Sequence, residues 1–140
     1  MAKTSAAVSN VGKVRASNQD SGYAGQYLHV VADGMGGHAG GDVASHLVIR
    51  QLLILDKPFE DAELAREELH TALLIANEML SDVVNEHPEL AGLGTTVSAA
   101  LRVGDQMVIA HIGDSRVYLQ REGVLSQVTV DHTFVQRLID

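Results

Sequence analysis

A mostly apolar run at residues 28–32 (LHVVA) ends in Asp33 and leads directly into a glycine-rich segment at 34–41 (GMGGHAGG). A short apolar run bounded by glycine predicts a buried strand. Glycine also lets the backbone approach a ligand closely and adopt turns that other residues resist. The sequence therefore predicts a strand that holds the Asp33 carboxylate at its end, where its oxygens could face a metal ion.

The segments around this strand predict an α+β fold, because strands, two helices and further strands follow one another along the chain. The expected elements are a hairpin over 21–31, helices over 42–55 and 61–85, strands over 95–103, 107–112, 116–120 and 125–130, and the first turns of a helix over 133–140.

Several of these boundaries carry a local signal. Gly22 and Gly25 are candidates for the turn of the hairpin, and Asp42 can cap the first helix. The second helix has apolar residues at helical spacing, and His87 and Pro88 are expected to end it.

The last residues bear on domain organisation. Phe134, Val135, Leu138 and Ile139 would bury one face of a helix, yet the chain stops at residue 140. A short frayed helix is one interpretation. We favour the other, in which residues 1–140 are the N-terminal portion of one longer domain.

Composition excludes several classes of function. The net charge is −8 and no basic stretch offsets it, so a nucleic-acid partner is not expected. The absence of cysteine excludes disulfides, thiolate zinc sites and a cysteine nucleophile. No window approaches the roughly 20 apolar residues of a membrane span. No membrane segment is expected in this chain, and a cytoplasmic location is the default.

Three carboxylates lie where an expected strand meets a loop: Asp20, Asp33 and Asp114. Hard oxygen ligands without a histidine or cysteine pattern suit Mg²⁺ or Mn²⁺. Each aspartate alone could be an ordinary turn residue, and only the three together indicate a metal site. Arg15 could bind two oxygens of a phosphoryl group, or it could be a solvated charge or an ion pair with Asp20.

Other polar residues near these clusters have weaker roles. Thr95 and Thr96 could contribute hydroxyls to packing near the site. Ser115 lies outside the GxSxG pattern of a serine nucleophile. His38, in the glycine-rich segment, and His132 are the histidines that could serve as a proton donor.

Taken together, these clusters resemble the metal-dependent serine/threonine protein phosphatases of the PPM, or type 2C, family. The matching segments, in the order of the family, are VGKVRASNQD at 11–20, VVADGMGGHAGG at 30–41, GLGTTVSAAL at 92–101, AHIGDSRVYL at 110–119 and TVDHTFVQRLID at 129–140. The DGMGG and SNQD forms look bacterial, and most like the actinobacterial branch.

The resemblance implies a role for each matching residue. Arg15 would bind the substrate phosphate, and Asp20 would act beside one metal through its bound waters. Asp33 would bridge two Mn²⁺ or Mg²⁺ ions, and the Gly34 carbonyl would ligate one of them. Asp114 would help to hold the third ion of bacterial members. Two bridged ions can lower the pKa of a shared water, which then needs no protein nucleophile.

The resemblance also implies two stacked antiparallel β-sheets flanked by helix pairs, an α-β-β-α sandwich that this chain would contain incompletely. The substrates would be phosphoserine and phosphothreonine proteins, including serine/threonine kinases and their substrates. Many eukaryotic members have histidine where this chain has Met35. Because the family's remaining metal-binding aspartates lie further toward the C-terminus, we expect the chain alone to bind metal weakly. The alternative is a non-catalytic phosphate- or phosphoprotein-binding module.

Overall fold

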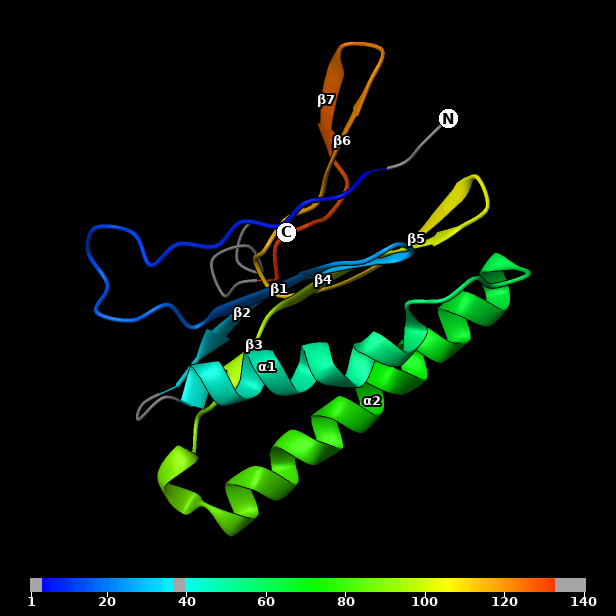
Figure 1. Ribbon diagram of the computed structural model, residues 1–140. Helices are drawn as coiled ribbons and strands as arrows, with labels where there is room; N and C mark the ends of the chain where they lie inside the picture. The colour runs from blue at the N-terminus through cyan, green and yellow to red at the C-terminus, as the bar shows by residue number, and fades with distance from the viewer. Residues whose placement is uncertain (1–3, 37–39, 133–140) are drawn as a thin grey trace.

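The computed structural model describes residues 4–36 and 40–132 (Figure 1). Residues 4–19 precede the first strand without forming a helix or strand of their own. The elements, in chain order, are β1 (Asp20–Ala24), β2 (Leu28–Met35), α1 (Gly40–Leu52), the 3₁₀ turn η1 (Leu53–Leu55), α2 (Ala62–Glu86), the 3₁₀ turn η2 (Pro88–Leu90), β3 (Gly94–Thr95), β4 (Val97–Val103), β5 (Gln106–Ile112), β6 (Tyr118–Arg121) and β7 (Val124–Gln127).

The main sheet is antiparallel, in the order β1-β2-β4-β5, and the short strand β3 also pairs with β2. The strand predicted over this apolar run forms as β2, but only one of its two faces is buried. Leu28, Val30 and Ala32 are buried on one face, whereas Val31 and Asp33 are exposed on the other. The alternation therefore orients the Asp33 side chain away from the helix-covered core.

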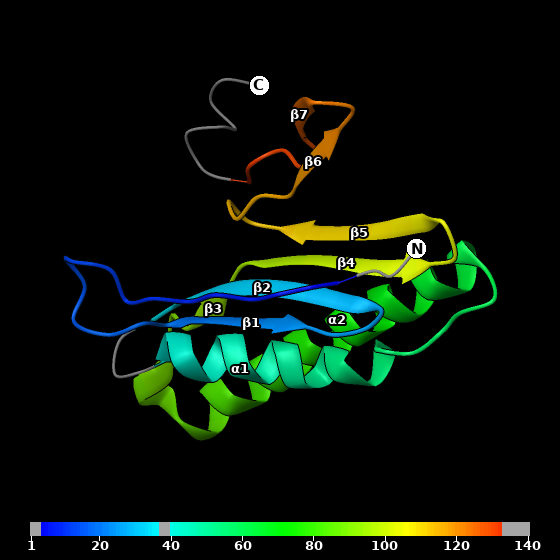
Figure 2. The ribbon, with the colours of Figure 1, turned by 45° about the horizontal axis from the view of Figure 1, so that its top comes forward.

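Helices α1 and α2 cover one face of this sheet, as Figure 2 shows. The amide of Leu64 donates to the Asp61 carboxylate at 2.7 Å, so Asp61 is the N-cap of α2. From there a stripe of Ala65, Leu69, Ala72 and Ala76 is buried against the sheet and α1. Small residues at this spacing allow the long helix to lie close to its neighbours.

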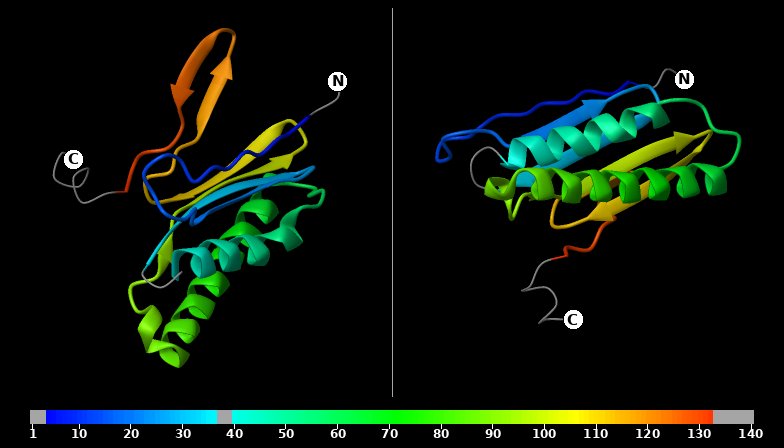
Figure 3. Two further views of the ribbon diagram at one scale, coloured as in Figure 1. Left: turned by 60° about the vertical axis from the view of Figure 1, so that its left-hand side comes forward. Right: turned by 90° about the horizontal axis from the view of Figure 1, so that it is seen from below.

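The other face of the sheet meets a second, thinner layer. The β6–β7 hairpin forms a separate two-stranded antiparallel sheet that projects away from the main one (Figure 3). Segment 6–10 and residues 115–118 face the exposed side of β1 and β2 across an open groove of about 880 Å³. The predicted α+β fold with two antiparallel sheets is confirmed. Of the two predicted helix pairs, the described residues contain one.

The helix boundaries were predicted closely, with one exception. Helix α1 already includes Gly40, so Asp42 lies in its first turn and the prediction that Asp42 caps the helix is wrong. Gly22 is likewise paired within β1, opposite Val31, and Gly25 alone of the two predicted glycines lies in the turn. The amide of Gly25 closes that turn by donating to the Leu28 carbonyl at 2.8 Å.

The strand predicted over 95–103 is divided at Thr96 into β3 and β4. The amide and the side-chain hydroxyl of Thr96 both form hydrogen bonds with the backbone of Asp33, so Thr96 does not take part in the regular strand pairing. Strand β6 begins two residues after its predicted start, and strand β7 begins one residue before its predicted start. The helix predicted over 133–140 lies outside the described residues.

Candidate active site

Asp20 and Asp33 face each other across the first two strands. Asp20 begins β1, and its Cα pairs with that of Asp33 in β2. The Asn18 side chain accepts a hydrogen bond from the Asp20 amide at 3.0 Å and so fixes the start of β1. Sequence reasoning proposed both carboxylates, and the antiparallel register brings them together.

The two carboxyl groups interact strongly enough to change the acidity of one of them. Partial burial of the Asp33 carboxyl, followed by its hydrogen bond to Asp20 and the negative charge of Asp20, raises the pKa of Asp33 above its ordinary value. The positive charge of Arg15 acts in the opposite direction. Since two adjacent carboxylates repel each other, a cation placed between them would be stabilised.

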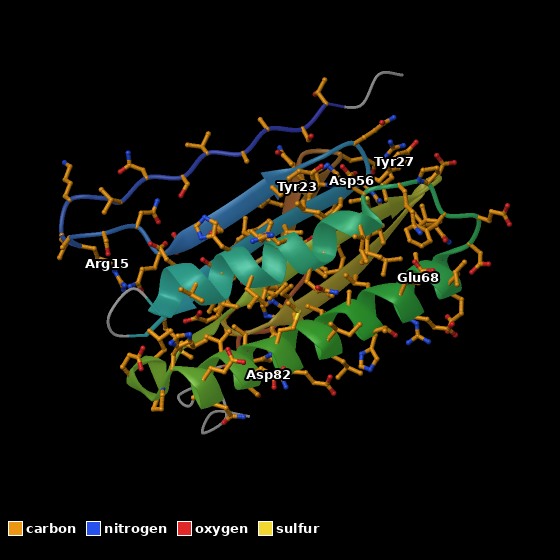
Figure 4. The ribbon with its side chains drawn as sticks, turned by 60° about the horizontal axis from the view of Figure 1, so that its bottom comes forward. Arg15, Tyr23, Tyr27, Asp56, Glu68 and Asp82 are labelled. Carbon is orange, nitrogen blue, oxygen red and sulfur yellow. The ribbon has the colours of Figure 1, made fainter. Side chains whose placement is uncertain are left out.

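Arg15 lies on the loop that leads into β1, near the end of the sheet at which β1 begins with Asp20 (Figure 4). Within the described part of the chain Arg15 makes no hydrogen bond or ion pair, but its positive charge acts to lower the pKa of Asp33. The alternative prediction of an ion pair with Asp20 is not seen there. The guanidinium is exposed beside the carboxylate pair, where its planar donors can reach an incoming anion.

Gly34 is a glycine because no space exists for a larger residue. A Cβ atom there would lie 2.5 Å from the Gly41 carbonyl carbon and 2.7 Å from the Gln19 carbonyl oxygen, and real Cβ atoms do not approach so closely. The Gly34 amide donates to that Gln19 carbonyl at 3.1 Å. The first turn of α1, the end of β2 and the residue before Asp20 therefore touch through their backbones.

Thr96 holds the backbone of Asp33 from the other side. The Asp33 amide donates to Thr96 Oγ1 at 2.9 Å, and the Thr96 amide donates to the Asp33 carbonyl at 2.9 Å. Thr96 Oγ1 also lies 2.6 Å from Ser115 Oγ. Ser115 therefore has a structural hydrogen bond, and its segment is tied to the strand that carries Asp33.

Asp114 is not brought to the carboxylate pair. It is exposed, and it forms no hydrogen bond or ion pair with the residues described at 4–36 and 40–132. No group of three or more His, Cys, Asp or Glu side chains that could share a metal ion occurs in those two ranges. The described structure thus assembles Asp20 and Asp33, with Arg15 near and Asp114 apart.

The two histidines considered as proton donors differ in what can be said of them. His38 lies outside the described residues. His132 accepts a hydrogen bond from the Gly113 amide at 3.3 Å, and its ring lies 4.9 Å from that of His111. These contacts fasten the segment after β7 to the end of β5.

Sequence reasoning missed Ser45, a fully buried residue of α1 that bonds to the residues on both sides of Asp20. Its position in a helical pattern gives no such signal, because the contact depends on how α1 docks onto β1. Gln19, the residue before Asp20, also takes part in these contacts. Its carbonyl accepts the Gly34 amide, and its side chain reaches the Gly36 carbonyl at 3.5 Å.

The residues present fit part of the ligand set of a hard divalent cation. Asp20 and Asp33 supply carboxylate oxygens from two fixed strands, and no nitrogen or sulfur ligand stands beside them among the described residues. Ions such as Mg²⁺ and Mn²⁺ prefer such oxygen ligands and usually retain several waters. The raised pKa of Asp33 beside the negative charge of Asp20 is consistent with that preference.

Comparison with known proteins identifies the family. Residues 13–135 match the family described as protein phosphatase 2C. The chain belongs to the protein phosphatase 2C family. The resemblance inferred from the sequence motifs is thereby confirmed.

Curated serine/threonine phosphatases resemble the chain over almost all of its length. It is 49% identical over 135 residues to the serine/threonine protein phosphatase PstP of Mycobacterium tuberculosis, covering 96% of this chain and 26% of PstP. It is 40% identical over 137 residues to the serine/threonine phosphatase stp of Listeria monocytogenes, covering 91% of this chain and 54% of stp. The chain thus spans only about a quarter to a half of these relatives.

Solved structures of serine/threonine phosphatases have the same fold. The crystal structure of M. tuberculosis PstP/Ppp matches with a TM-score of 0.86 and 48% identity, over 91% of this chain and 54% of that one. The PstP catalytic domain in complex with two manganese ions matches with a TM-score of 0.85 and 48% identity, over 91% and 55%. None of the helices described here is long and apolar enough to span a membrane.

Proposed function

We propose that this chain carries part of the active site of a metal-dependent enzyme that hydrolyses phosphoserine and phosphothreonine in proteins. The observation that carries the proposal is the facing pair of Asp20 and Asp33 with Arg15 beside it. Membership of the protein phosphatase 2C family supports the reaction class, and the manganese-bound PstP domain supports Mn²⁺ as one suitable ion.

The proposed roles follow from what each residue offers. Asp33 would bridge two ions, the Gly34 carbonyl would ligate one, and Asp20 would act through bound water. When bound, the ions supply a water of lowered pKa and positive charge facing the phosphoryl oxygens. The chain itself fixes these oxygen ligands by the β1–β2 register and by the two bonds from Thr96 to the Asp33 backbone.

Arg15 is proposed to bind the substrate phosphate. Its guanidinium lies on the exposed loop before β1 and influences Asp33, so a phosphoryl group held by Arg15 would lie close to the carboxylate pair. Since Arg15 would contact the substrate and not the metal, its loss should affect substrate binding selectively. Asp114 is proposed as a ligand of a further ion, at a separate position from the pair.

We also propose that residues 1–140 form the N-terminal portion of one phosphatase domain. The comparison with relatives supports this, because the chain covers 54% of Listeria stp. So does the half-exposed apolar surface on the open face of the sheet, which includes Val31 and Met107. Further oxygen ligands would then come from outside this chain, since three carboxylates and a carbonyl are too few for two ions.

The proposed partners are phosphorylated proteins in the cytoplasm, including serine/threonine kinases and their substrates. A non-catalytic phosphoprotein-binding module remains the second candidate, and one observation favours it. Within residues 4–36 and 40–132 the structure assembles two carboxylates but no group of three. Such a module would still present Arg15 to a phosphate, but it would show no turnover.

The test is hydrolysis of a phosphothreonine peptide, and of p-nitrophenyl phosphate, with and without Mn²⁺. It should be run on this chain and on the full-length protein as the cell makes it. We expect Mn²⁺-stimulated phosphate release from the full-length protein and little from the 140-residue chain. Peptide binding without release in both would support the binding module and contradict the enzyme.

A further inference from the structure

We propose that Ser45 is a positioning residue that acts through Asp20, by fastening the residues on both sides of that carboxylate to helix α1. This inference rests on the proposed function of Asp20 as part of a metal site. Ser45 lies in α1 and has no exposed surface. A hydroxyl at such a position requires hydrogen-bond partners, because an unpaired buried hydroxyl costs about 1–3 kcal/mol.

The partners of Ser45 are the two neighbours of Asp20. Ser45 Oγ donates to the Gln19 carbonyl at 2.9 Å, and it lies 2.9 Å from Ser21 Oγ. Because a hydroxyl has one proton, and Ser45 gives it to Gln19, the Ser21 hydroxyl is the donor of the second bond. The contact of Ser45 Oγ with the Asp42 carbonyl within its own helix is longer, at 3.4 Å.

The same Gln19 carbonyl also accepts the Gly34 amide at 3.1 Å, so one oxygen joins α1, β1 and the end of β2. A carbonyl has two lone pairs, and both are used here. Asp20 therefore lies between two anchored residues and opposite Asp33. Its carboxylate is held relative to Asp33 and Gly34 by the position of α1.

Packing alone does not require a serine at this position. Ala44, the preceding residue of α1, is equally buried and has no polar group. Serine in a helix commonly bonds to its own helix, whereas the short bonds of Ser45 leave the helix for the segment around Asp20. The hydroxyl thus serves the carboxylate segment, and its removal should loosen Asp20 without opening a large cavity.

The decisive experiment is a double-mutant cycle on the Mn²⁺ dissociation constant, measured by electron paramagnetic resonance of free Mn²⁺ in the full-length protein as the cell makes it. Partners of metal ligands typically change affinity by about 10- to 100-fold. We expect Ser45→Ala to weaken binding about tenfold in the wild-type background. In the Asp20→Ala background it should weaken binding less than twofold, because its effect passes through Asp20.

Ser98→Ala is the matched control. Ser98 is also a buried serine, 3% exposed, and its hydroxyl bonds to His111 Nδ1 at 2.9 Å. Its removal should lower the unfolding midpoint in urea about as much as Ser45→Ala does, and leave Mn²⁺ affinity unchanged. Should Ser45→Ala fail to fold, Ser21→Ala removes one of the two bonds at a half-buried residue and should weaken binding about threefold.

The outcomes separate this inference from the proposed function. If the wild type binds Mn²⁺ and releases phosphate, but Ser45→Ala weakens binding equally with and without Asp20, Ser45 is a structural residue and this inference is wrong. An equal loss of affinity in Ser98→Ala would contradict it as well. If the wild type binds no Mn²⁺, the proposed function fails, and the role of Ser45 fails with it.

Discussion

Replacement of Gly34 by alanine tests the backbone contact on which the site is built. The new Cβ would lie 2.5 Å from the Gly41 carbonyl carbon and 2.7 Å from the Gln19 carbonyl oxygen. Both obstructing atoms belong to the backbone, so no change of rotamer can relieve the overlap. Helix α1 or the segment before β1 would have to move.

The size of the effect follows from two opposing contributions. Overpacking of this kind costs typically about 1–3 kcal/mol, occasionally more, and the backbone location favours the upper limit. Alanine also reduces the entropy of the unfolded chain, which returns about 0.4–1 kcal/mol. The expected net loss in the free energy of unfolding is therefore about 2–3 kcal/mol.

Urea unfolding of the metal-free protein measures this loss. With a slope of about 1–3 kcal/mol per molar for a small protein, the midpoint should fall by about 0.7–3 M. Gly22→Ala is the matched control in the adjacent strand β1, where the nearest atom to a new Cβ is the Val30 carbonyl oxygen at 3.6 Å. Its free energy of unfolding should stay within about 0.5 kcal/mol of the wild-type value. An unchanged midpoint for Gly34→Ala, or equal losses in both variants, would refute the close contact.

Three further predictions concern single side chains. Burial and the neighbouring Asp20 raise the pKa of Asp33, so the protonated form stabilises the fold and this stability is lost as pH rises through the folded-state pKa. In urea unfolding, metal-free Asp33→Asn should therefore be at least as stable as wild type at pH 7, and the difference in stability should narrow at lower pH. The same substitution should abolish Mn²⁺-dependent turnover. Arg15→Ala should raise KM for a phosphopeptide severalfold in steady-state assays and leave the Mn²⁺ dissociation constant unchanged, whereas a weakened Mn²⁺ affinity would contradict its role. Asp56→Ala removes the carboxylate that accepts hydrogen bonds from the Tyr27 and Leu28 amides, at 2.8 and 3.1 Å, and should lower the free energy of unfolding by about 2 kcal/mol, measured by thermal unfolding. Asp56→Asn keeps an oxygen acceptor and should lower it less, so an equal loss in both variants would contradict the importance of these bonds.

Sequence patterns predicted the elements whose causes are local. Helix α2 was predicted because its apolar stripe and the His87–Pro88 stop both lie within the segment itself. Strand β2 was predicted for the same kind of reason, since its apolar run and the glycines that follow it lie within the segment; that only one face is buried was not predicted. These features need no knowledge of a partner in space.

Features that depend on docking between distant segments could not be predicted. Thr96 interrupts a run of strand-forming residues because its amide and hydroxyl bond to Asp33, a residue far away in the sequence. Asp42 has a capping side chain, yet α1 begins before it, where Gly40 and Gly41 pack against Leu93 and Gln19. Ser45 was missed for the same reason.

Part of the candidate site could be predicted and part could not. The facing of Asp20 and Asp33 follows from a hairpin whose turn contains Gly25, and that hairpin was predicted from sequence. The separation of Asp114 from this pair was not predicted, because residues 113 and 114 form a bend directly after β5 and no local pattern determines its direction. Roles assigned to these residues through the family remain predictions.

The most direct test of the central claim is the position of bound Mn²⁺. Crystals of the full-length protein grown with Mn²⁺ should give anomalous difference peaks at the manganese edge. We predict two peaks about 3.5–4 Å apart with the Asp33 carboxylate between them, and loss of both peaks in Asp33→Asn. Peaks that lie away from Asp33, or that persist in the Asn variant, would contradict the account.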